Sequence, residues 1–172
     1  MSAINEKINE FIDLSFIPYE FSSKPILVGG LAMEGYGLRK HGEDIDFIIT
    51  DQDYQQLAQR YPQYKKDTWG DLHLRIGSYE LLRSISRLDY SFYEQNAIEY
   101  KEYKIVSFER LFFMTAAAVR SEPDVQKRID DFGLALEYCY HHYRNPSFVA
   151  YADAHNASYL AAPDGTISQD KY

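Results

Sequence analysis

Short apolar segments alternate with amphipathic ones along the first half of the chain. Residues 3–14 carry isoleucine, phenylalanine and leucine at helical spacing, which predicts an amphipathic first helix. Residues 26–28 are entirely apolar, as expected of a buried central strand, and a second apolar strand is predicted over 44–49. Polar N-cap residues follow it, so we expect a helix over 51–60, ended by Pro62.

The second half of the chain changes from strand-like to helical patterning. Apolar and polar residues alternate over 72–76, as in a half-buried strand, and the region 81–93 reads as one or two further strands. Another strand is predicted over 100–106. Helical spacing then returns in a helix over 108–120, which Ser107 can cap, and in a long final helix over about 125–143.

The order of these elements predicts an α+β fold, with a mixed β-sheet flanked by helices and further helices at the C-terminal end. We expect a single domain over residues 1–145, with a core over about 24–115 and C-terminal helices over about 108–143. Beyond it the pattern dissolves into alanine, serine, aspartate and glycine. Residues 146–172 are therefore expected to form a loosely ordered tail.

The chemistry is concentrated between the first two apolar strands. The first strand runs into Gly29 and Gly30, and the second opens with Asp44-Ile-Asp46. Because residues two apart in a strand point to the same face, Asp44 and Asp46 should project side by side. Two adjacent carboxylates repel unless a cation or a proton lies between them. With a glycine turn that lets backbone approach a phosphate, the pattern predicts a metal-dependent nucleotide site.

These motifs resemble the signature of the nucleotidyltransferase superfamily, whose fold is shared by DNA polymerase beta, by aminoglycoside and lincosamide nucleotidyltransferases, and by minimal bacterial and toxin-type members. The signature is an apolar residue, Gly, and Gly or Ser, then a spacer, then Asp, an apolar residue, Asp or Glu, and another apolar residue. Here the chain reads Val28-Gly-Gly30, thirteen intervening residues, and Asp44-Ile-Asp-Phe47. The resemblance implies a nucleotidyltransferase-like sheet over the core.

The resemblance also implies an activity: transfer of a nucleoside monophosphate from a nucleoside triphosphate to a hydroxyl, with release of pyrophosphate. Two Mg²⁺ ions, with Mn²⁺ as the alternative, would be held by two carboxylates on one strand and a third on a neighbouring strand. Asp44 and Asp46 correspond to the pair. For the third ligand, which would also activate the acceptor, we favour Asp89, because strand alternation places it beside Arg87; Asp71, near a turn, is the competing candidate.

Nucleotide-binding residues follow from the same resemblance. Gly29 and Gly30 would approach the phosphates, and Arg39 is the most plausible guanidinium contact to them. The segment 120–131 is similar to an Arg, Lys, Asp pattern near the C-terminus of some bacterial members, where a lysine faces the nucleotide, and this places Lys127 in the site. Thr115 stands where a further lysine would be sought, which departs from the family pattern.

Composition constrains the cellular setting. The net charge of −8 works against non-specific nucleic-acid binding. A single cysteine gives no disulfide within the chain, and no apolar run approaches the ~20 residues that span a bilayer. We therefore expect a cytoplasmic protein without a membrane partner.

The sequence leaves the acceptor open among a tRNA end, a protein hydroxyl and a small molecule. It also leaves two other readings. One is a catalytically inactive protein of this fold that binds nucleotide or a partner protein, for example as a toxin–antitoxin component. The other is a structural domain in which the glycines form a turn and the aspartates act as caps.

Overall fold

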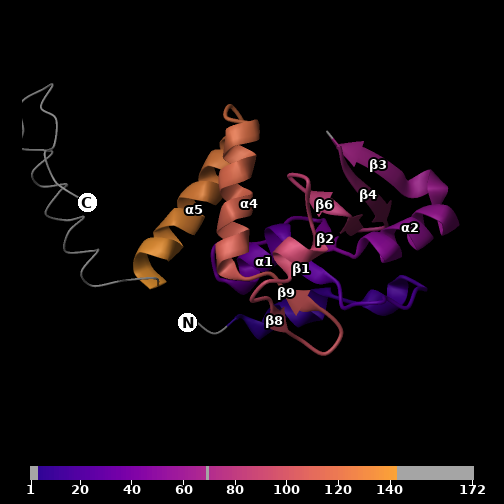
Figure 1. The fold of residues 1–172 in the computed structure, drawn as a ribbon. Helices are drawn as coiled ribbons and strands as arrows, with labels where there is room; N and C mark the ends of the chain where they lie inside the picture. Colours follow the sequence, from indigo (N-terminus) through magenta and orange to yellow (C-terminus); the bar gives the residue numbers. More distant parts are fainter. Residues whose placement is uncertain (1–3, 69, 143–172) are drawn as a thin grey trace, which may run out of the picture. The chain divides into compact units, whose positions relative to one another are not determined.

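The computed structural model describes residues 4–68 and 70–142 and has a mixed α+β architecture (Figure 1). The α+β class, the mixed sheet and the C-terminal helices predicted from the sequence are confirmed. The chain divides into one compact unit that ends at Leu136 and a second that begins at Glu137. Of the second unit only residues 137–142, the end of the last helix, are described. The predicted tail over 146–172 lies outside the described residues.

One seven-stranded sheet organises the first unit, in the order β3-β4-β5-β2-β1-β9-β8. Strand β1 pairs antiparallel with β2 and parallel with β9, and β2 pairs parallel with β5. The strands of this sheet are β1 (Ile26–Val28), β2 (Ile45–Ile48), β3 (Lys65–Thr68), β4 (Asp71–Ile76), β5 (Tyr79–Leu82), β8 (Ile98–Glu99) and β9 (Lys104–Ile105). A separate hairpin consists of β6 (Ser84–Ile85) and β7 (Leu88–Asp89).

Helices connect and cover these strands. The α-helices are α1 (Gly29–Gly35), α2 (Asp51–Arg60), α3 (Tyr90–Tyr93), α4 (Phe108–Ser121) and α5 (Gln126–His142). The 3₁₀-helices are η1 (Glu6–Phe11), η2 (Leu14–Phe16) and η3 (Pro62–Tyr64). In the described ranges, none of the helices combines the length and apolar character needed to cross a bilayer.

Apolar strand residues build the core as the pattern predicts. All three residues of β1 are buried, and Phe47 and Ile48 of β2 are fully buried beside them. Helix α2 spans the predicted 51–60, and the Thr50 hydroxyl accepts a hydrogen bond from the Asp53 amide at its start. Helix α4 also begins where predicted, but the Ser107 side chain makes no capping hydrogen bond.

Three predicted elements differ from the structure. The strand expected over 100–106 is reduced to β9, Lys104–Ile105. The amphipathic helix expected over 3–14 is replaced by η1 and η2, because Asp13 accepts a hydrogen bond from the Ser15 amide and starts a new turn there. The strands expected over 81–93 are β5, the β6–β7 hairpin and the short helix α3. The polar residues that interrupt this region end one element and cap the next.

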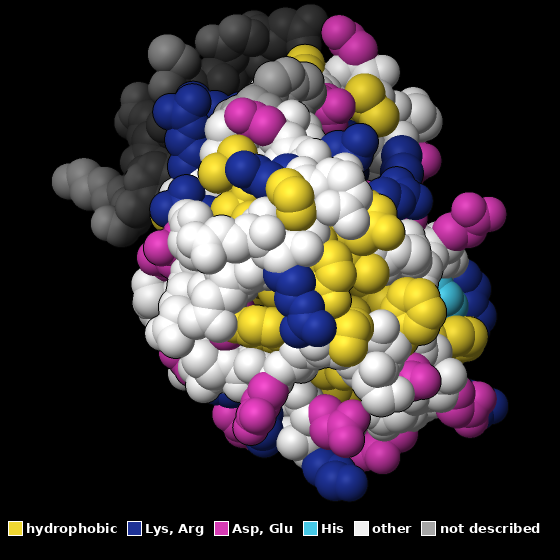
Figure 2. All heavy atoms as spheres, turned by 90° about the vertical axis from the view of Figure 1, so that its right-hand side faces the viewer, with side chains coloured by type: hydrophobic (Ala, Val, Ile, Leu, Met, Phe, Trp, Pro, Cys, Tyr) yellow, Lys and Arg dark blue, Asp and Glu magenta, His cyan; other side chains and the backbone are white. Residues whose placement is uncertain are grey.

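Some large apolar side chains remain at the surface. Figure 2 shows a face on which hydrophobic side chains gather around a basic side chain, with acidic side chains along one edge. In the N-terminal 3₁₀ segment, Phe16 is 60% exposed and Phe11 45% exposed. Single exposed aromatic side chains such as these two are normal in folded proteins.

Candidate active site

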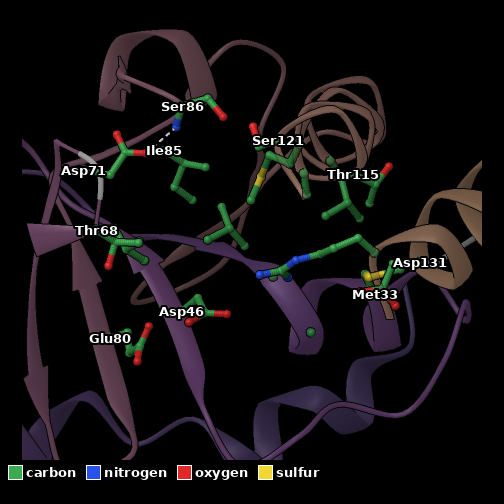
Figure 3. Close-up of a pocket in the computed structure, with 18 of the residues that line it drawn as sticks. Met33, Asp46, Thr68, Asp71, Glu80, Ile85, Ser86, Thr115, Ser121 and Asp131 are labelled. Carbon is green, nitrogen blue, oxygen red and sulfur yellow. Dashed lines mark hydrogen bonds between the residues drawn. The ribbon is translucent and has the colours of Figure 1, made fainter. Parts of the chain in front are cut away.

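An open cavity of about 690 Å³ lies in the first unit, over the centre of the sheet. Its lining comes from the β1–α1 turn, from β2 and β5, from the β6–β7 hairpin and from α4 and the start of α5. In Figure 3, Asp46 and Glu80 rise from neighbouring strands, Asp71 and Ser86 lie above them, and Thr115 lies on the helical wall across the cavity. Charged and apolar groups therefore share one concave surface.

Strand register brings Asp46 and Glu80 together. Asp46 is the direct partner of Glu80 across the parallel pair β2–β5, and of Val28 across β1–β2. Residues at opposed positions project from the same face of the sheet, and Asp46 and Glu80 both line the cavity. The alternate residues Ile45 and Phe47 are buried on the other face. The floor of the cavity thus carries two adjacent carboxylates.

The environment of Asp46 opposes its negative charge. Burial, followed by the negative charges of Glu80 and Asp44, raises the pKa of Asp46 from 3.8 to about 6, although Lys127 and Arg128 act in the opposite direction. A carboxylate in this position gains stability from any cation that binds beside it. A cation bound at the cavity floor would therefore stabilise the ionised form of Asp46.

The glycine turn fits against this carboxylate. Gly29 has a φ of +62°, and a Cβ added to it would lie 2.0 Å from Oδ2 of Asp46. Residue 29 must therefore be glycine, for its backbone conformation and for the space that Asp46 occupies. At Gly30 the nearest atom to an added Cβ would be Nη1 of Arg39 at 3.4 Å, an ordinary contact. The predicted association of the glycine turn with Asp46 is present in the structure.

Arg39 lines the cavity, but its guanidinium is already paired. It donates to both carboxylate oxygens of Asp131, at 2.5 Å from Nε and 2.9 Å from Nη2. Asp131 is only 7% exposed, so the pair is largely buried. This bidentate pair joins the loop before β2 to α5. Arg39 therefore positions α5 in this structure, and its predicted contact with phosphate stays a prediction.

Lys127 also lines the cavity, one helical turn before Asp131. Its Nζ lies 4.0 Å from Oδ2 of Asp131, at the limit of an ion pair, and its side chain is 65% exposed. Because Asp131 already binds Arg39 at shorter distances, the Lys127 ammonium interacts only weakly with this carboxylate. The placement predicted from the sequence therefore leaves a cation facing the cavity.

A second polar network fixes the loop between α1 and β2. Glu34, 4% exposed, accepts hydrogen bonds from Lys40 Nζ at 2.6 Å and from the His41 amide at 2.9 Å, and its carboxylate lies 2.6 Å from His41 Nδ1. The bonds from Lys40 and then His41 lower the pKa of Glu34 from 4.5 to about 2, against the effect of burial. These bonds therefore hold Lys40 and His41 in place within the loop that leads to Asp44.

Asp44 is held away from the cavity lining. It precedes β2, and its Oδ1 accepts a hydrogen bond from Arg75 Nη2 at 2.6 Å. Arg75 also donates to Glu80 at 3.4 Å, so its guanidinium bridges the carboxylates of Asp44 and Glu80. Asp44 is close enough to affect the pKa of Asp46, but in this conformation its oxygen serves an ion pair.

Asp89, the favoured third carboxylate, is not among the residues that line the cavity. It is exposed and caps α3, where its Oδ1 accepts hydrogen bonds from the Ser91 amide and hydroxyl. The bond from Ser91 lowers the pKa of Asp89. Alternation failed to place Asp89 because the chain turns between β6 and β7, so residues 81–89 do not form one continuous strand.

Asp71, the competing candidate, does line the cavity, but its oxygens bind the β6–β7 hairpin. The residue that the sequence reasoning missed is Glu80. Its local pattern, Tyr79-Glu80-Leu81, has an acid between apolar residues, as Ile45-Asp46-Phe47 does, and it follows the turn at Gly77. That signal, together with a parallel pairing of β5 with β2, would have identified it.

Across residues 4–68 and 70–142, no three His, Cys, Asp or Glu side chains form a group arranged to hold a metal ion. The two floor carboxylates are the oxygen ligands that a hard divalent cation prefers. Comparisons with protein-family models, curated proteins and solved structures found no match to this chain. Function is therefore inferred from the site itself.

Proposed function

We propose that this protein is a metal-dependent nucleotidyltransferase, which moves a nucleoside monophosphate from a nucleoside triphosphate to a hydroxyl acceptor and releases pyrophosphate. The observation that carries the proposal is the opposed pair Asp46–Glu80 beneath the Gly29 turn. Two carboxylates on adjacent strands, beside a turn whose backbone closely approaches one of them, Asp46, suit a phosphate-bound divalent cation. The sheet arrangement around β1, β2 and β5 supports membership of the nucleotidyltransferase superfamily.

Mg²⁺ fits the donor set at the cavity floor. Asp46 and Glu80 supply hard oxygen ligands. Burial, and after it the nearby negative charges, raise the pKa of Asp46, and a bound cation would stabilise its charged form. When bound, the metal would neutralise phosphate charge and lower the pKa of the attacking hydroxyl. Asp44 becomes an additional ligand only if Arg75 releases it, because its Oδ1 now accepts from that guanidinium. Binding at Asp44 is therefore coupled to a movement of Arg75.

The residues around the floor divide the remaining tasks. The backbone at Gly29 and Gly30 approaches the phosphates, and Lys127 adds a positive charge on the same side. The Arg39–Asp131 pair holds α5 so that Lys127 faces the cavity. Glu80 takes the place proposed for Asp89, as metal ligand and as the group that accepts the proton of the attacking hydroxyl.

The cavity also has an apolar wall. Met33, Leu111 and Met114 line the helical side, and Ile85 lines the hairpin side. Such surfaces favour the base and sugar of a nucleotide, whereas the floor favours its phosphates. The division between a charged floor and an apolar wall matches the two ends of a nucleoside triphosphate.

The test is calorimetric titration of each of the four nucleoside triphosphates in the presence of Mg²⁺. We expect binding by the wild-type protein, and a loss of about tenfold or more with Asp46→Asn or Glu80→Gln. Asp89→Asn is the matched control, because Asp89 is an exposed cap outside the cavity, and it should bind as the wild type does. Absence of binding by the wild type, or equal losses in all three variants, would reject the proposed site.

A second candidate function is nucleotide binding without turnover, as in a partner-regulated or toxin–antitoxin protein. The ion pair between Asp44 and Arg75 favours it, because a reaction with two metals requires more oxygen ligands than Asp46 and Glu80 provide. The two functions differ in one product. Triphosphate binding with release of pyrophosphate indicates the transferase, whereas binding without pyrophosphate release, across the candidate acceptors, indicates the binding protein.

A further inference from the structure

The β6–β7 hairpin turns through two residues that adopt an unfavourable backbone conformation. Ser86 has a φ of +52° and Arg87 a φ of +61°, and they form the two-residue loop between the paired residues Ile85 and Leu88. Such loops favour Asn-Gly or Gly-Gly, because glycine adopts a positive φ freely and asparagine tolerates it, whereas most other residues are strained there. Strain of this kind persists only where surrounding contacts enforce it.

Asp71 supplies those contacts. Its Oδ2 accepts a hydrogen bond from the Ser86 amide at 2.7 Å, and its Oδ1 accepts from the Arg87 amide at 2.8 Å and from the Ser84 hydroxyl at 2.7 Å. One carboxylate thus binds both strained amides. Because Asp71 opens β4, which is anchored in the sheet between β3 and β5, these bonds attach the tip of the hairpin to the rim of the cavity.

The clamped turn presents Arg87 to the cavity. Arg87 lines the cavity. Its Nε would lie 3.5 Å from a Cβ added to Gly70, so the Arg87 side chain passes over this glycine. In the described part of the chain, no carboxylate forms an ion pair with Arg87. The other two arginines of the cavity differ: Arg39 binds Asp131, and Arg128 binds Glu122 at 2.8 Å.

The sheet order places this guanidinium on a particular side of the floor carboxylates. Gly29 and Gly30 follow β1, which lies on one side of β2, whereas Glu80, and beyond it the β4 residue His73, lie on the other side. Asp71 and the hairpin it holds belong to this second side. Arg87 therefore stands across Asp46 and Glu80 from the glycine turn to which the proposed function assigns the triphosphate.

We infer that the Ser86–Arg87 turn forms the acceptor subsite, and that Arg87 binds a phosphate group that the acceptor carries near its reacting hydroxyl. Asp71 is the positioning residue that holds this turn. The inference rests on the proposed function, because it takes the glycine side as the nucleotide side. A guanidinium binds phosphate through two parallel hydrogen bonds, so Arg87, which has no ion pair within residues 4–68 and 70–142, suits such an acceptor at the rim of the cavity. His73 lies on the same side and adds a second polar group.

Binding of simple probes without metal or triphosphate tests this subsite. The probes are uridine 5′-monophosphate, a short single-stranded oligouridylate with a free 3′-hydroxyl, and uncharged uridine. We expect Arg87→Ala to weaken binding of at least one phosphate-bearing probe by about tenfold, and Arg87→Lys to weaken it less, because lysine keeps the charge but not the fork. Arg60→Ala, the same change on an exposed arginine of α2 outside the cavity, should leave binding unchanged.

The two phosphate probes distinguish the source of the phosphate. Stronger binding of the oligonucleotide identifies a polynucleotide end, and equal or stronger binding of the monophosphate identifies a free nucleotide. Equal binding of uridine and the phosphate probes, an unchanged affinity in Arg87→Ala, or no binding of any probe would overturn the inference. Because the triphosphate titrations with Asp46→Asn test the floor alone, failure of the subsite and failure of the proposed function are separate results.

The positioning role of Asp71 has its own test. Asp71→Ala should weaken phosphate binding about as much as Arg87→Ala, although Arg87 is intact. Adding Ser86→Gly should restore part of that binding, because glycine adopts a positive φ without the clamp. A double variant Asp71→Ala/Ser86→Gly that folds and still binds no better than Asp71→Ala would overturn the positioning role. Thermal unfolding of each variant shows which of them are folded.

Discussion

The carboxylate of Asp46 occupies the space that a side chain on residue 29 would need. A Cβ at Gly29 would lie 2.0 Å from Oδ2 and 3.0 Å from Cγ of Asp46. The turn after β1 and the charged residue of β2 are therefore fitted to each other through strand pairing, since Val28 is the direct partner of Asp46. A side chain on residue 29 would therefore displace the carboxylate of Asp46.

Substitution of this glycine should be costly. We expect Gly29→Ala to lower the free energy of unfolding by about 2–3 kcal/mol, from the strain at φ +62° and the displacement of Asp46. Gly30→Ala is the matched control: its Cβ would meet its nearest atom at 3.4 Å, and we expect a change within about 1 kcal/mol. Urea denaturation of both variants makes the comparison, and equal losses would contradict the fit described above.

The pKa of Asp46 predicts a pH-dependent stability. Burial and neighbouring charges raise its pKa from 3.8 to about 6 in the fold, so the folded state binds this proton more tightly than the unfolded state. Its stabilising contribution is complete below pH 3.8 and is lost as the pH rises through 6. Asp46→Asn should therefore be more stable than the wild type by about 2 kcal/mol at pH 7.5, and no more stable near pH 3.5.

Urea denaturation across this pH range, with a chelator present, measures the difference. A constant difference between the two proteins from pH 3.5 to 7.5 would show that the pKa of Asp46 is not raised. Added Mg²⁺ at pH 7.5 should stabilise the wild type and not Asp46→Asn, because a bound cation favours the charged carboxylate.

The pair between Arg39 and Asp131 should contribute strongly to stability. Asp131→Asn leaves a mostly buried guanidinium without its charged partner, and we expect a loss of about 2–3 kcal/mol. Asp130→Asn is the control on the neighbouring exposed residue, which accepts a hydrogen bond from the Gln126 side chain at 2.7 Å, and its loss should be below about 0.5 kcal/mol. Thermal or urea unfolding of both variants measures the two losses. Similar losses would mean that the Arg39–Asp131 pair does not hold α5 in place.

Glu34 predicts the opposite pH dependence to Asp46. Hydrogen bonds from Lys40 and His41 lower its pKa from 4.5 to about 2, so its contribution is present above pH 4.5 and is lost as the pH falls toward 2. Glu34→Gln should cost about 2 kcal/mol at pH 7, and the difference from wild type should shrink below pH 4.5. Glu43→Gln, on an exposed neighbour in the same loop, should show no such trend.

Sequence reasoning succeeded where local patterns decide the structure. The apolar run at 26–28 and the capped segment at 51–60 gave the bounds of β1 and α2, because burial and capping act over a few residues. The glycine turn and Asp46 were also placed together correctly. Their proximity follows from a short antiparallel connection, which the spacing between them already indicates.

It failed where pairing between distant strands decides the structure. Glu80 becomes a neighbour of Asp46 only through the parallel register of β2 and β5, whereas Asp89 seemed equivalent as long as residues 81–93 were treated as continuous strands. The partner of Arg39 was equally hidden, since Asp131 lies 92 positions further along the chain. The local sequence shows that a charged residue is present, but tertiary contacts determine which residue it pairs with.

The order of strands in the sheet has a consequence during synthesis of the chain on the ribosome. Strand β1 pairs with β2 within 23 residues of itself, but its other edge is covered by β9, whose Ile105 is the partner of Leu27. A nascent chain emerging N-terminus first can therefore assemble Gly29, Asp46 and Glu80 while one edge of β1 is still open to other strands. The acidic floor can form before the wall that carries Lys127 has been synthesised, and during that interval the open edge of β1 can pair with other strands.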